Sequence, residues 1–157
     1  MTGWRIGYGA GPAELIERMI KLQGHSTSGP PGICQRAAYA ALTGPTDDLE
    51  RMRAAFTRRR AAMVDLLCKI PDVTCPTPEG AFYCLPDLHA FFGRRHHEKA
   101  MTDACTLAEA LLEHAKAAVV PGDAFGAPYA LRFSYACSEA AIRSGMDRVT
   151  SFLTSLR

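Results

Sequence analysis

The sequence lacks a long apolar run, a signal peptide and a strong excess of either charge. No stretch approaches the roughly 20 apolar residues that a membrane span needs, and the first residues show neither the charged nor the apolar region of a signal peptide. Lysine and arginine number 18 against 16 acidic residues, a net charge of +2. Such a balance gives no electrostatic reason to bind nucleic acid or an acidic membrane. We therefore expect a globular cytoplasmic protein with neither kind of partner.

Patterned cysteines and nucleotide-binding motifs are missing too. The six cysteines are scattered, without a CxxC pair or a regular framework, which favours reduced thiols in an intracellular protein. Structural zinc sites use tighter, paired spacings. The pattern therefore argues against a zinc site, and we expect no bound metal. The residues that could have formed such a site are Cys75, Cys84, His89, His96 and His97. The P-loop and GxGxxG patterns are absent, and no set of nucleophile, base and orienting residue can be assembled.

The first part of the chain is predicted to be an extended segment followed by helices. Alternating apolar residues predict a strand over residues 4–9. Apolar spacing and turn residues predict helices over residues 15–24, 33–42 and 47–70. The predicted strand has no partner in this half, and an isolated strand leaves its backbone groups unpaired. We therefore expect residues 1–43 to expose apolar surface that a larger sheet would cover.

After Pro71 the pattern changes to short strands covered by helices. Leu107, Leu111 and Leu112 are expected on the apolar side of a helix. The predicted strands cover residues 81–85, 117–120 and 131–136, and the predicted helices cover residues 103–114 and 138–156. We expect an α/β chain whose second half is an α+β unit, with the domain boundary between residues 1–70 and 71–157.

Two arginines are candidates for binding an oxyanion. Arg5 stands among Gly3, Ile6 and Gly7, and small neighbours allow a phosphate or carboxylate to approach an arginine fork. Arg132 lies in a predicted strand whose alternation puts Leu131, Phe133 and Tyr135 on the opposite face. A buried arginine there needs a partner, which a ligand carboxylate would supply. The alternative for both residues is an arginine that faces solvent on a strand.

Taken together, several short stretches resemble the pyridoxal 5'-phosphate (PLP)-dependent class I/II aminotransferases of fold type I, in the branch of the bacterial aspartate aminotransferases. They occur in the family's order and cover nearly the whole chain. The matching stretches are MTGWRIGY (residues 1–8), STSGP (26–30), TPEGAFY (77–83), VPGDAFG (120–126) and LRFSYA (131–136).

The resemblance implies a role for particular residues. Arg5 matches the arginine that binds the cofactor phosphate, and Arg132 matches the arginine that binds the substrate α-carboxylate. Thr27 and Ser28 are implied near the cofactor of the neighbouring subunit of a homodimer. Gly80 and Phe82 are implied on the substrate side. The implied substrates are an amino acid and a 2-oxo acid.

The resemblance also implies that the chain is the C-terminal portion of such an enzyme, with the end of the large domain followed by the small domain. The Schiff-base lysine of the family would lie a few residues before Met1, and Lys21, Lys69, Lys99 and Lys116 match no motif position. We therefore expect no catalytic lysine here and no activity of the chain alone. The alternatives are an interaction or regulatory module derived from a small domain, and another fold type I PLP enzyme.

Overall fold

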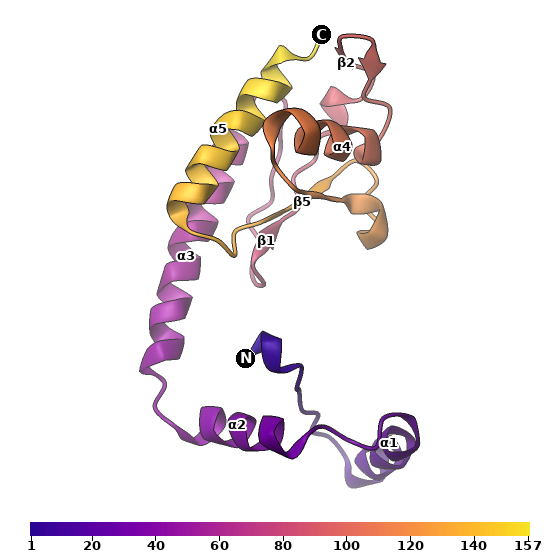
Figure 1. Cartoon of the computed structure of the whole chain (residues 1–157), viewed down its shortest axis with the longest axis vertical. Coiled ribbons are helices and arrows are strands. Elements are labelled where there is room, and N and C mark those ends of the chain that lie inside the picture. Colours follow the sequence, from indigo (N-terminus) through magenta and orange to yellow (C-terminus); the bar gives the residue numbers. More distant parts are fainter. The chain divides into compact units, whose positions relative to one another are not determined.

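The computed structural model describes the backbone of residues 1–157 and every side chain except that of Thr2. The chain forms two compact units, Met1–Leu49 and Glu50–Arg157 (Figure 1). Among the described residues, no helix is both long and apolar enough to span a membrane.

The first unit is made of helices joined by extended segments. It contains a short 3-10 helix η1 (Thr2–Trp4), helices α1 (Ala13–Ser26) and α2 (Gly32–Thr43), and the start of α3 (Asp47–Cys68). Proline occupies the N-cap position of both α1 and α2, where its missing N–H leaves no helical hydrogen bond unmade. The predicted helices are confirmed, and α1 continues two residues past Gly24.

The strand predicted over residues 4–9 is wrong. Residues 2–4 form η1, and residues 5–12 adopt no strand or helix. The apolar alternation is present, but a strand exists only when a neighbouring strand accepts its backbone hydrogen bonds. In this unit the structure describes no strand that could pair with it.

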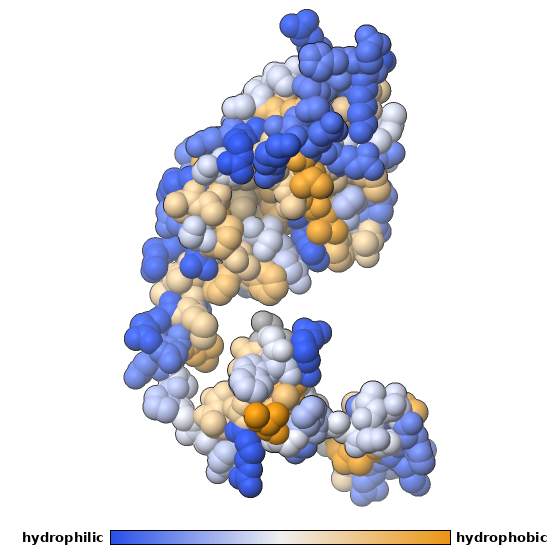
Figure 2. Space-filling view, in the orientation of Figure 1, coloured by the Kyte–Doolittle hydropathy of each residue, from blue (hydrophilic) through white to orange (hydrophobic). Residues whose placement is uncertain are grey.

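Apolar side chains of the first unit are exposed, as the sequence predicts. Neither α1 nor α2 has a buried residue. Figure 2 shows hydrophobic side chains at the surface of this unit. The most exposed are Tyr8, Leu22, Ile33, Leu42, Tyr39 and Ile20, at 65–83% exposure.

The second unit is an α+β fold around an antiparallel sheet, as expected. Strands β1 (Tyr83–Cys84), β4 (Val120–Pro121) and β5 (Leu131–Ser134) are ordered β1-β5-β4. Tyr83 pairs with Ser134, and Val120 pairs with Arg132. The elements outside this sheet are the hairpin strands β2 (Arg95–His96) and β3 (Lys99–Ala100), the 3-10 helices η2 (His89–Phe91) and η3 (Gly122–Phe125), and helices α4 (Ala104–Ala115) and α5 (Glu139–Ser155).

The core of the second unit lies between the sheet and the helices. Leu131, Phe133 and Tyr135 are 0%, 4% and 1% exposed, so the predicted alternation of β5 is confirmed. Helices α4 and α5 pack against each other, and the C-terminal half of α3 adds Met63 and Leu67 to the same core. Leu107 and Leu111 are buried, but Leu112 is 56% exposed. That part of the prediction is wrong because adjacent helical residues point about 100° apart.

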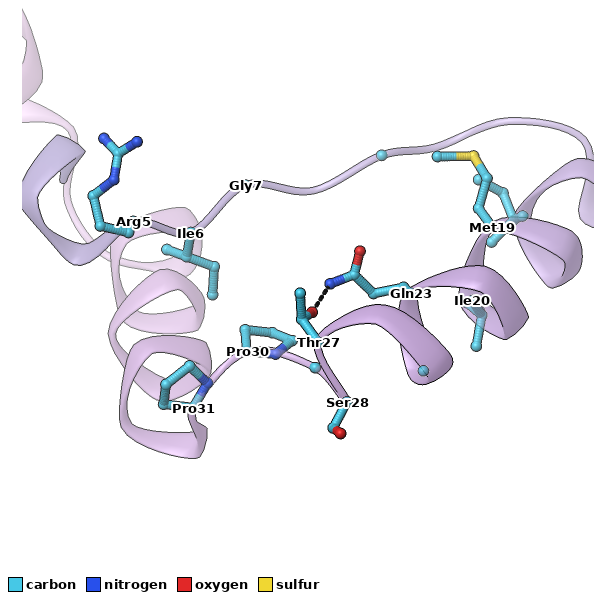
Figure 3. Close-up of a pocket in the computed structure, with 14 residues that line it drawn as sticks. Arg5, Ile6, Gly7, Met19, Ile20, Gln23, Thr27, Ser28, Pro30 and Pro31 are labelled. Carbon is cyan, nitrogen blue, oxygen red and sulfur yellow. Dashed lines mark hydrogen bonds between the residues drawn. The ribbon is translucent and has the colours of Figure 1, made fainter.

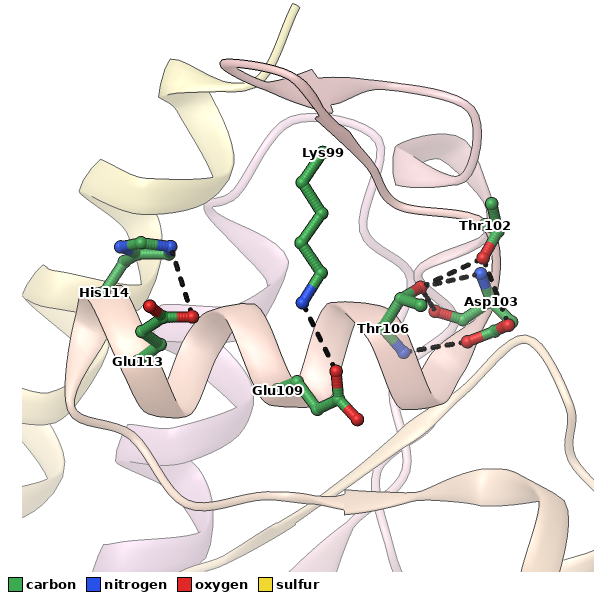
Figure 4. Close-up of polar contacts among 7 residues, drawn as sticks. All are labelled: Lys99, Thr102, Asp103, Thr106, Glu109, Glu113 and His114. Carbon is green, nitrogen blue, oxygen red and sulfur yellow. Dashed lines mark hydrogen bonds and ion pairs between the residues drawn. The ribbon is translucent and has the colours of Figure 1, made fainter.

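Local hydrogen bonds fix where α4 and α5 begin. The Asp103 side chain accepts a hydrogen bond from the Thr106 backbone N–H at 2.8 Å, and the Thr106 hydroxyl accepts one from the Asp103 backbone N–H at 3.0 Å (Figure 4). This capping box satisfies two backbone donors at once. Ser138 caps α5 by accepting from the Ala141 N–H at 3.2 Å. Both helix starts agree with the sequence prediction.

Candidate functional site

Arg132 lies on the face of β5 opposite the core, between two aromatic rings. Its guanidinium carbon is 4.9 Å from the centroid of the Tyr83 ring and 4.8 Å from that of the Phe125 ring. A cation over an aromatic face within about 6 Å is attracted by the ring quadrupole. The two rings therefore restrict the plane and position of the guanidinium.

Strand pairing and a tight turn bring these two rings to Arg132. The register of β1 against β5 places Tyr83 beside Arg132. Phe125 is the last residue of η3. This turn is held by two hydrogen bonds: the Gly122 N–H donates to the Ala130 carbonyl at 2.8 Å, and the Gly122 carbonyl accepts from the Ala127 N–H at 3.0 Å. Residues far apart in sequence thus form one site because β5 lies between β1 and β4.

The Arg132 guanidinium is able to bind a negatively charged ligand. The side chain is partly buried, and among the described residues no carboxylate forms an ion pair with it. An arginine fork binds a carboxylate through two parallel hydrogen bonds. The arrangement suits a small ligand that carries a carboxylate.

Phe82 lies next to this site, whereas Gly80 has no contact that places it there. The Phe82 ring meets the Tyr83 ring edge to face at 4.8 Å and is 40% exposed. Gly80 is exposed, and a Cβ added to it would meet nothing within 4 Å. The two predicted substrate-side residues therefore differ in their relation to Arg132.

Tyr135 anchors the segment that carries Phe82 and Tyr83. Its backbone N–H donates to the Phe82 carbonyl at 2.9 Å, and its hydroxyl donates to the Ala81 carbonyl at 3.2 Å. Burial raises the pKa of the Tyr135 hydroxyl, with a further contribution from Cys84 and a partial offset from the positive charge of Arg60. The hydroxyl is therefore a neutral hydrogen-bond donor at physiological pH.

The first unit contains a cavity of about 650 Å³ that Arg5, Thr27 and Ser28 all line (Figure 3). Backbone of several glycines and the side chains of Met19 and Ile20 complete its wall. The Thr27 hydroxyl accepts a hydrogen bond from the Gln23 side chain. In Figure 3 the Arg5 guanidinium points away from the end of α1, and the Ser28 side chain points to the other side of the helix end. The three residues share the cavity, but their side chains do not converge on one point.

Two of the residues in this cavity have unusual backbone conformations. Arg5 and Ser28 have positive φ angles of 51° and 63°. Residues other than glycine rarely adopt this left-handed backbone conformation, and those that do are often found at functional sites. Among the described residues, no three His, Cys, Asp or Glu side chains form a group that could hold a metal ion.

Aminotransferases are among the solved structures that share this arrangement of elements. The aspartate aminotransferase of Rhizobium meliloti matches the whole chain with a TM-score of 0.91 and 40% identity, and the match covers 40% of that protein. An aromatic aminotransferase of Pyrococcus horikoshii matches 98% of the chain with a TM-score of 0.85 and 32% identity, over 40% of its own length.

Sequence comparison leads to the same family. The profile of the family Aminotransferase class I and II matches residues 1–149. An aspartate aminotransferase of Geobacillus stearothermophilus is 46% identical over 98% of this chain and 38% of its own length. An aspartate/prephenate aminotransferase of Cereibacter sphaeroides is 46% identical over 99% of the chain and 39% of its own length. The chain belongs to the class I and II aminotransferase family, and it spans about two fifths of the length of these relatives.

Sequence reasoning found Arg132 and its face but missed the rings that hold it. Tyr83 and Phe125 lie in stretches that resemble the family, yet no spacing in the chain relates them to Arg132. Their roles depend on strand register and on the Gly122 turn, which involve contacts between distant residues.

Proposed function

We propose that this chain forms part of a PLP-dependent aminotransferase, which transfers an amino group between an amino acid and a 2-oxo acid. The observation that carries the proposal is Arg132, a cation held between two aromatic rings and without an ion-pair partner among the described residues. Family membership supports the reaction class. Arg132 binds the α-carboxylate of the substrate and orients the amino acid, with Phe82 and Gly80 on the substrate side.

The side chains of Arg5, Thr27 and Ser28 are of types that bind phosphate, and each is assigned here to the phosphate end of a PLP molecule by its chemistry rather than by convergence on one point. Arg5 supplies a permanent positive charge with a planar fork, and Thr27 and Ser28 supply hydroxyl groups. When bound, PLP supplies an electron sink for charge that develops at the substrate carbon. In our proposal Arg5 binds the phosphate within its own subunit. Thr27 and Ser28 lie near the cofactor of the second subunit of a homodimer.

We propose further that residues 1–70 belong to the large cofactor domain and residues 71–157 to the small domain. The chain would work in the cytoplasm, since its six cysteines are all free, as is usual in a reducing compartment. None of the four lysines occupies the family's catalytic position. We therefore propose that the chain alone does not transaminate, and measurable turnover by purified chain with PLP, an amino acid and a 2-oxo acid would contradict this.

The proposal can be tested by transplanting the chain into an active relative. The matching segment of the Geobacillus stearothermophilus aspartate aminotransferase is replaced by residues 1–157, and kcat and KM are measured with aspartate and with a panel of other amino acids. The chimera is expected to be active. Its preference among amino acids identifies the donors that these residues accept.

Substitution of Arg132 in the chimera tests the role of the guanidinium. A hydrogen bond to a charged group contributes about 1.5–3 kcal/mol, so Arg132→Gln is expected to lower kcat/KM roughly 10- to 150-fold. Arg132→Lys restores the charge without the fork and is expected to recover only part of this loss. Arg143→Gln is the matched control, because Arg143 is exposed and pairs with Glu139 on α5. A kcat/KM for Arg132→Gln equal to that of Arg143→Gln would refute the assignment.

The role of Arg5 is tested separately through cofactor retention. Arg5→Gln in the chimera is expected to raise the PLP concentration needed for half-maximal activity, with a smaller effect on KM for the amino acid at saturating PLP. An unchanged PLP requirement would contradict the phosphate assignment and leave that of Arg132 intact. An inactive chimera that binds PLP normally would instead favour an interaction or regulatory module.

A further inference from the structure

Helix α3 makes two side-chain contacts with residues 78–82, the segment that precedes β1. From a partly buried position, the Arg60 guanidinium donates a hydrogen bond to the Pro78 carbonyl at 2.9 Å. The Phe56 ring lies 6.5 Å from the Phe82 ring, measured between centroids. Residues four apart in a helix lie on the same face. One face of α3 therefore contacts both ends of segment 78–82.

Segment 78–82 has little packing of its own. Residues 79–82 are exposed and form neither a strand nor a helix. Ala81 has a φ angle of 60°, in the left-handed region that residues other than glycine rarely adopt. A backbone conformation of this kind persists only where the surrounding structure holds it. The shape of the segment therefore depends on the contacts at its two ends.

The two ends of the segment are held by different elements. At the far end, the Tyr135 backbone N–H donates to the Phe82 carbonyl and the Tyr135 hydroxyl donates to the Ala81 carbonyl. Tyr135 is fixed in the core at 1% exposure. At the near end, the hydrogen bond from Arg60 is the only one that reaches residues 78–80 among the described residues. Removal of this guanidinium would leave the segment attached at one end.

We propose that Arg60 is a positioning residue of the substrate site, which holds segment 78–82 against α3 and so sets where Phe82 lies relative to Arg132. The Phe82 ring meets the Tyr83 ring edge to face at 4.8 Å, and Tyr83 is one of the two rings that hold Arg132. The inference rests on the proposed function, because the substrate role of Phe82 belongs to it.

Arg60 acts on the wall of the site rather than on the group that binds the α-carboxylate. The two rings beside Arg132 are placed by strand register and by the turn of η3, and neither depends on Arg60. Phe82 is 40% exposed, so little packing opposes its movement once the segment is released. We therefore expect the loss of Arg60 to affect amino acids with long side chains more than alanine, whose side chain is a methyl group.

The hold of Arg60 on the segment is tested in the full chain with a glutamate-specific protease. Glu79 lies in the segment, and Glu98, between β2 and β3, is the internal reference. Arg60→Met keeps the apolar stem and removes the donor. We expect it to raise the cleavage rate after Glu79 several-fold relative to Glu98, because cleavage follows the population of locally open chain. Arg58→Met, at an exposed position of the same helix, is the matched control and should change neither rate.

The effect on the substrate is measured in the chimera with the Geobacillus stearothermophilus enzyme. Arg60→Met is expected to lower kcat/KM for the largest amino acid accepted by roughly 3- to 10-fold, mainly through KM, and to lower it less for alanine. The loss is smaller than for Arg132→Gln because Arg60 does not contact the substrate. Arg60→Lys should restore most of it, since one carbonyl needs one donor, whereas Arg132→Lys recovers only part.

Several results would overturn the proposal. Unchanged cleavage after Glu79 would show that Arg60 does not hold the segment, and equal acceleration at Glu79 and Glu98 would show a general loss of stability instead. Equal losses of kcat/KM for alanine and for the larger amino acid, or no rescue by Arg60→Lys, would refute the positioning role. A chimera that is inactive before any substitution of Arg60 would refute the proposed function and the substrate role together, and cleavage after Glu79 would still decide the contact with α3.

Discussion

At Gly122 the addition of a single methyl group should cause a large loss of stability. A Cβ added there would lie 2.1 Å from the Ala127 carbonyl oxygen and 2.6 Å from the Ala130 carbonyl oxygen. Both are backbone atoms, so no side-chain rotation relieves the clash. The same two segments bond to Gly122, at 3.0 Å from the Ala127 N–H and 2.8 Å to the Ala130 carbonyl. The turn must therefore open for the methyl group to fit.

The expected cost follows from the strain and from the two hydrogen bonds. Overpacking costs typically about 1–3 kcal/mol, and each lost hydrogen bond costs about 1 kcal/mol. We expect Gly122→Ala to lower the free energy of unfolding of the second unit by about 3–5 kcal/mol. Because η3 carries Phe125, the variant should also release one of the two rings that hold Arg132.

The assay is urea unfolding followed by far-UV circular dichroism. Tryptophan fluorescence does not serve, since the single tryptophan, Trp4, belongs to the first unit. Gly145→Ala in α5 is the control, because a Cβ there would meet nothing within 4 Å, and alanine in a helix interior is favoured over glycine by about 1 kcal/mol. The reasoning is refuted if Gly122→Ala unfolds at the wild-type urea concentration, or if the two variants shift the midpoint equally.

Three further predictions concern the cap of α4, the anchor of the β1 segment and the first unit. Asp103→Ala should lower the melting temperature at neutral pH. Hydrogen bonds, first that from the Thr106 N–H, hold the pKa of Asp103 below its ordinary value. Its stabilisation is therefore complete above the unfolded pKa of about 4 and is lost as pH falls through the lower folded value. Melting curves of wild type and variant should thus converge in acid, and a constant difference would contradict the linkage. Tyr135→Phe should cost about 1 kcal/mol in urea unfolding by leaving the Ala81 carbonyl without its donor, and a neutral effect would show that water replaces the hydroxyl. Backbone amides of α1 and α2 should exchange hydrogen faster than those of α5, since neither α1 nor α2 has a buried residue. Equal protection of the three helices against exchange, in a chain shown to be monomeric, would contradict the exposure of α1 and α2.

Helices were the part of the fold most readily predicted from the sequence. The spacing of Leu107 and Leu111, the cap at Asp103 and the cap at Ser138 are local signals, and local hydrogen bonds and burial follow from them. The expectation that Leu112 shares the buried face was wrong, because it follows Leu111 directly and adjacent helical residues point about 100° apart. The strand predicted over residues 4–9 was wrong for the corresponding reason. Alternation is a property of a segment, whereas a strand requires a second segment to pair with.

The candidate sites also combine features that the sequence predicts with features that only the folded chain shows. The alternation around Arg132 placed it on the face opposite Leu131 and Phe133, and the burial of those two residues confirms the face. Arg5, Thr27 and Ser28 were grouped only by family resemblance, and their shared cavity is a feature of the folded unit.

The sequence by itself determined the family, the positions of the helices and the face on which Arg132 stands. These depend on residue order and on interactions within a few residues, which a linear pattern records. Only the tertiary structure decided that Tyr83 and Phe125 enclose that arginine. It also decided that residues 5–12 form no strand. Each of these depends on which distant backbone segments exchange hydrogen bonds, and that pairing exists only once the chain has folded.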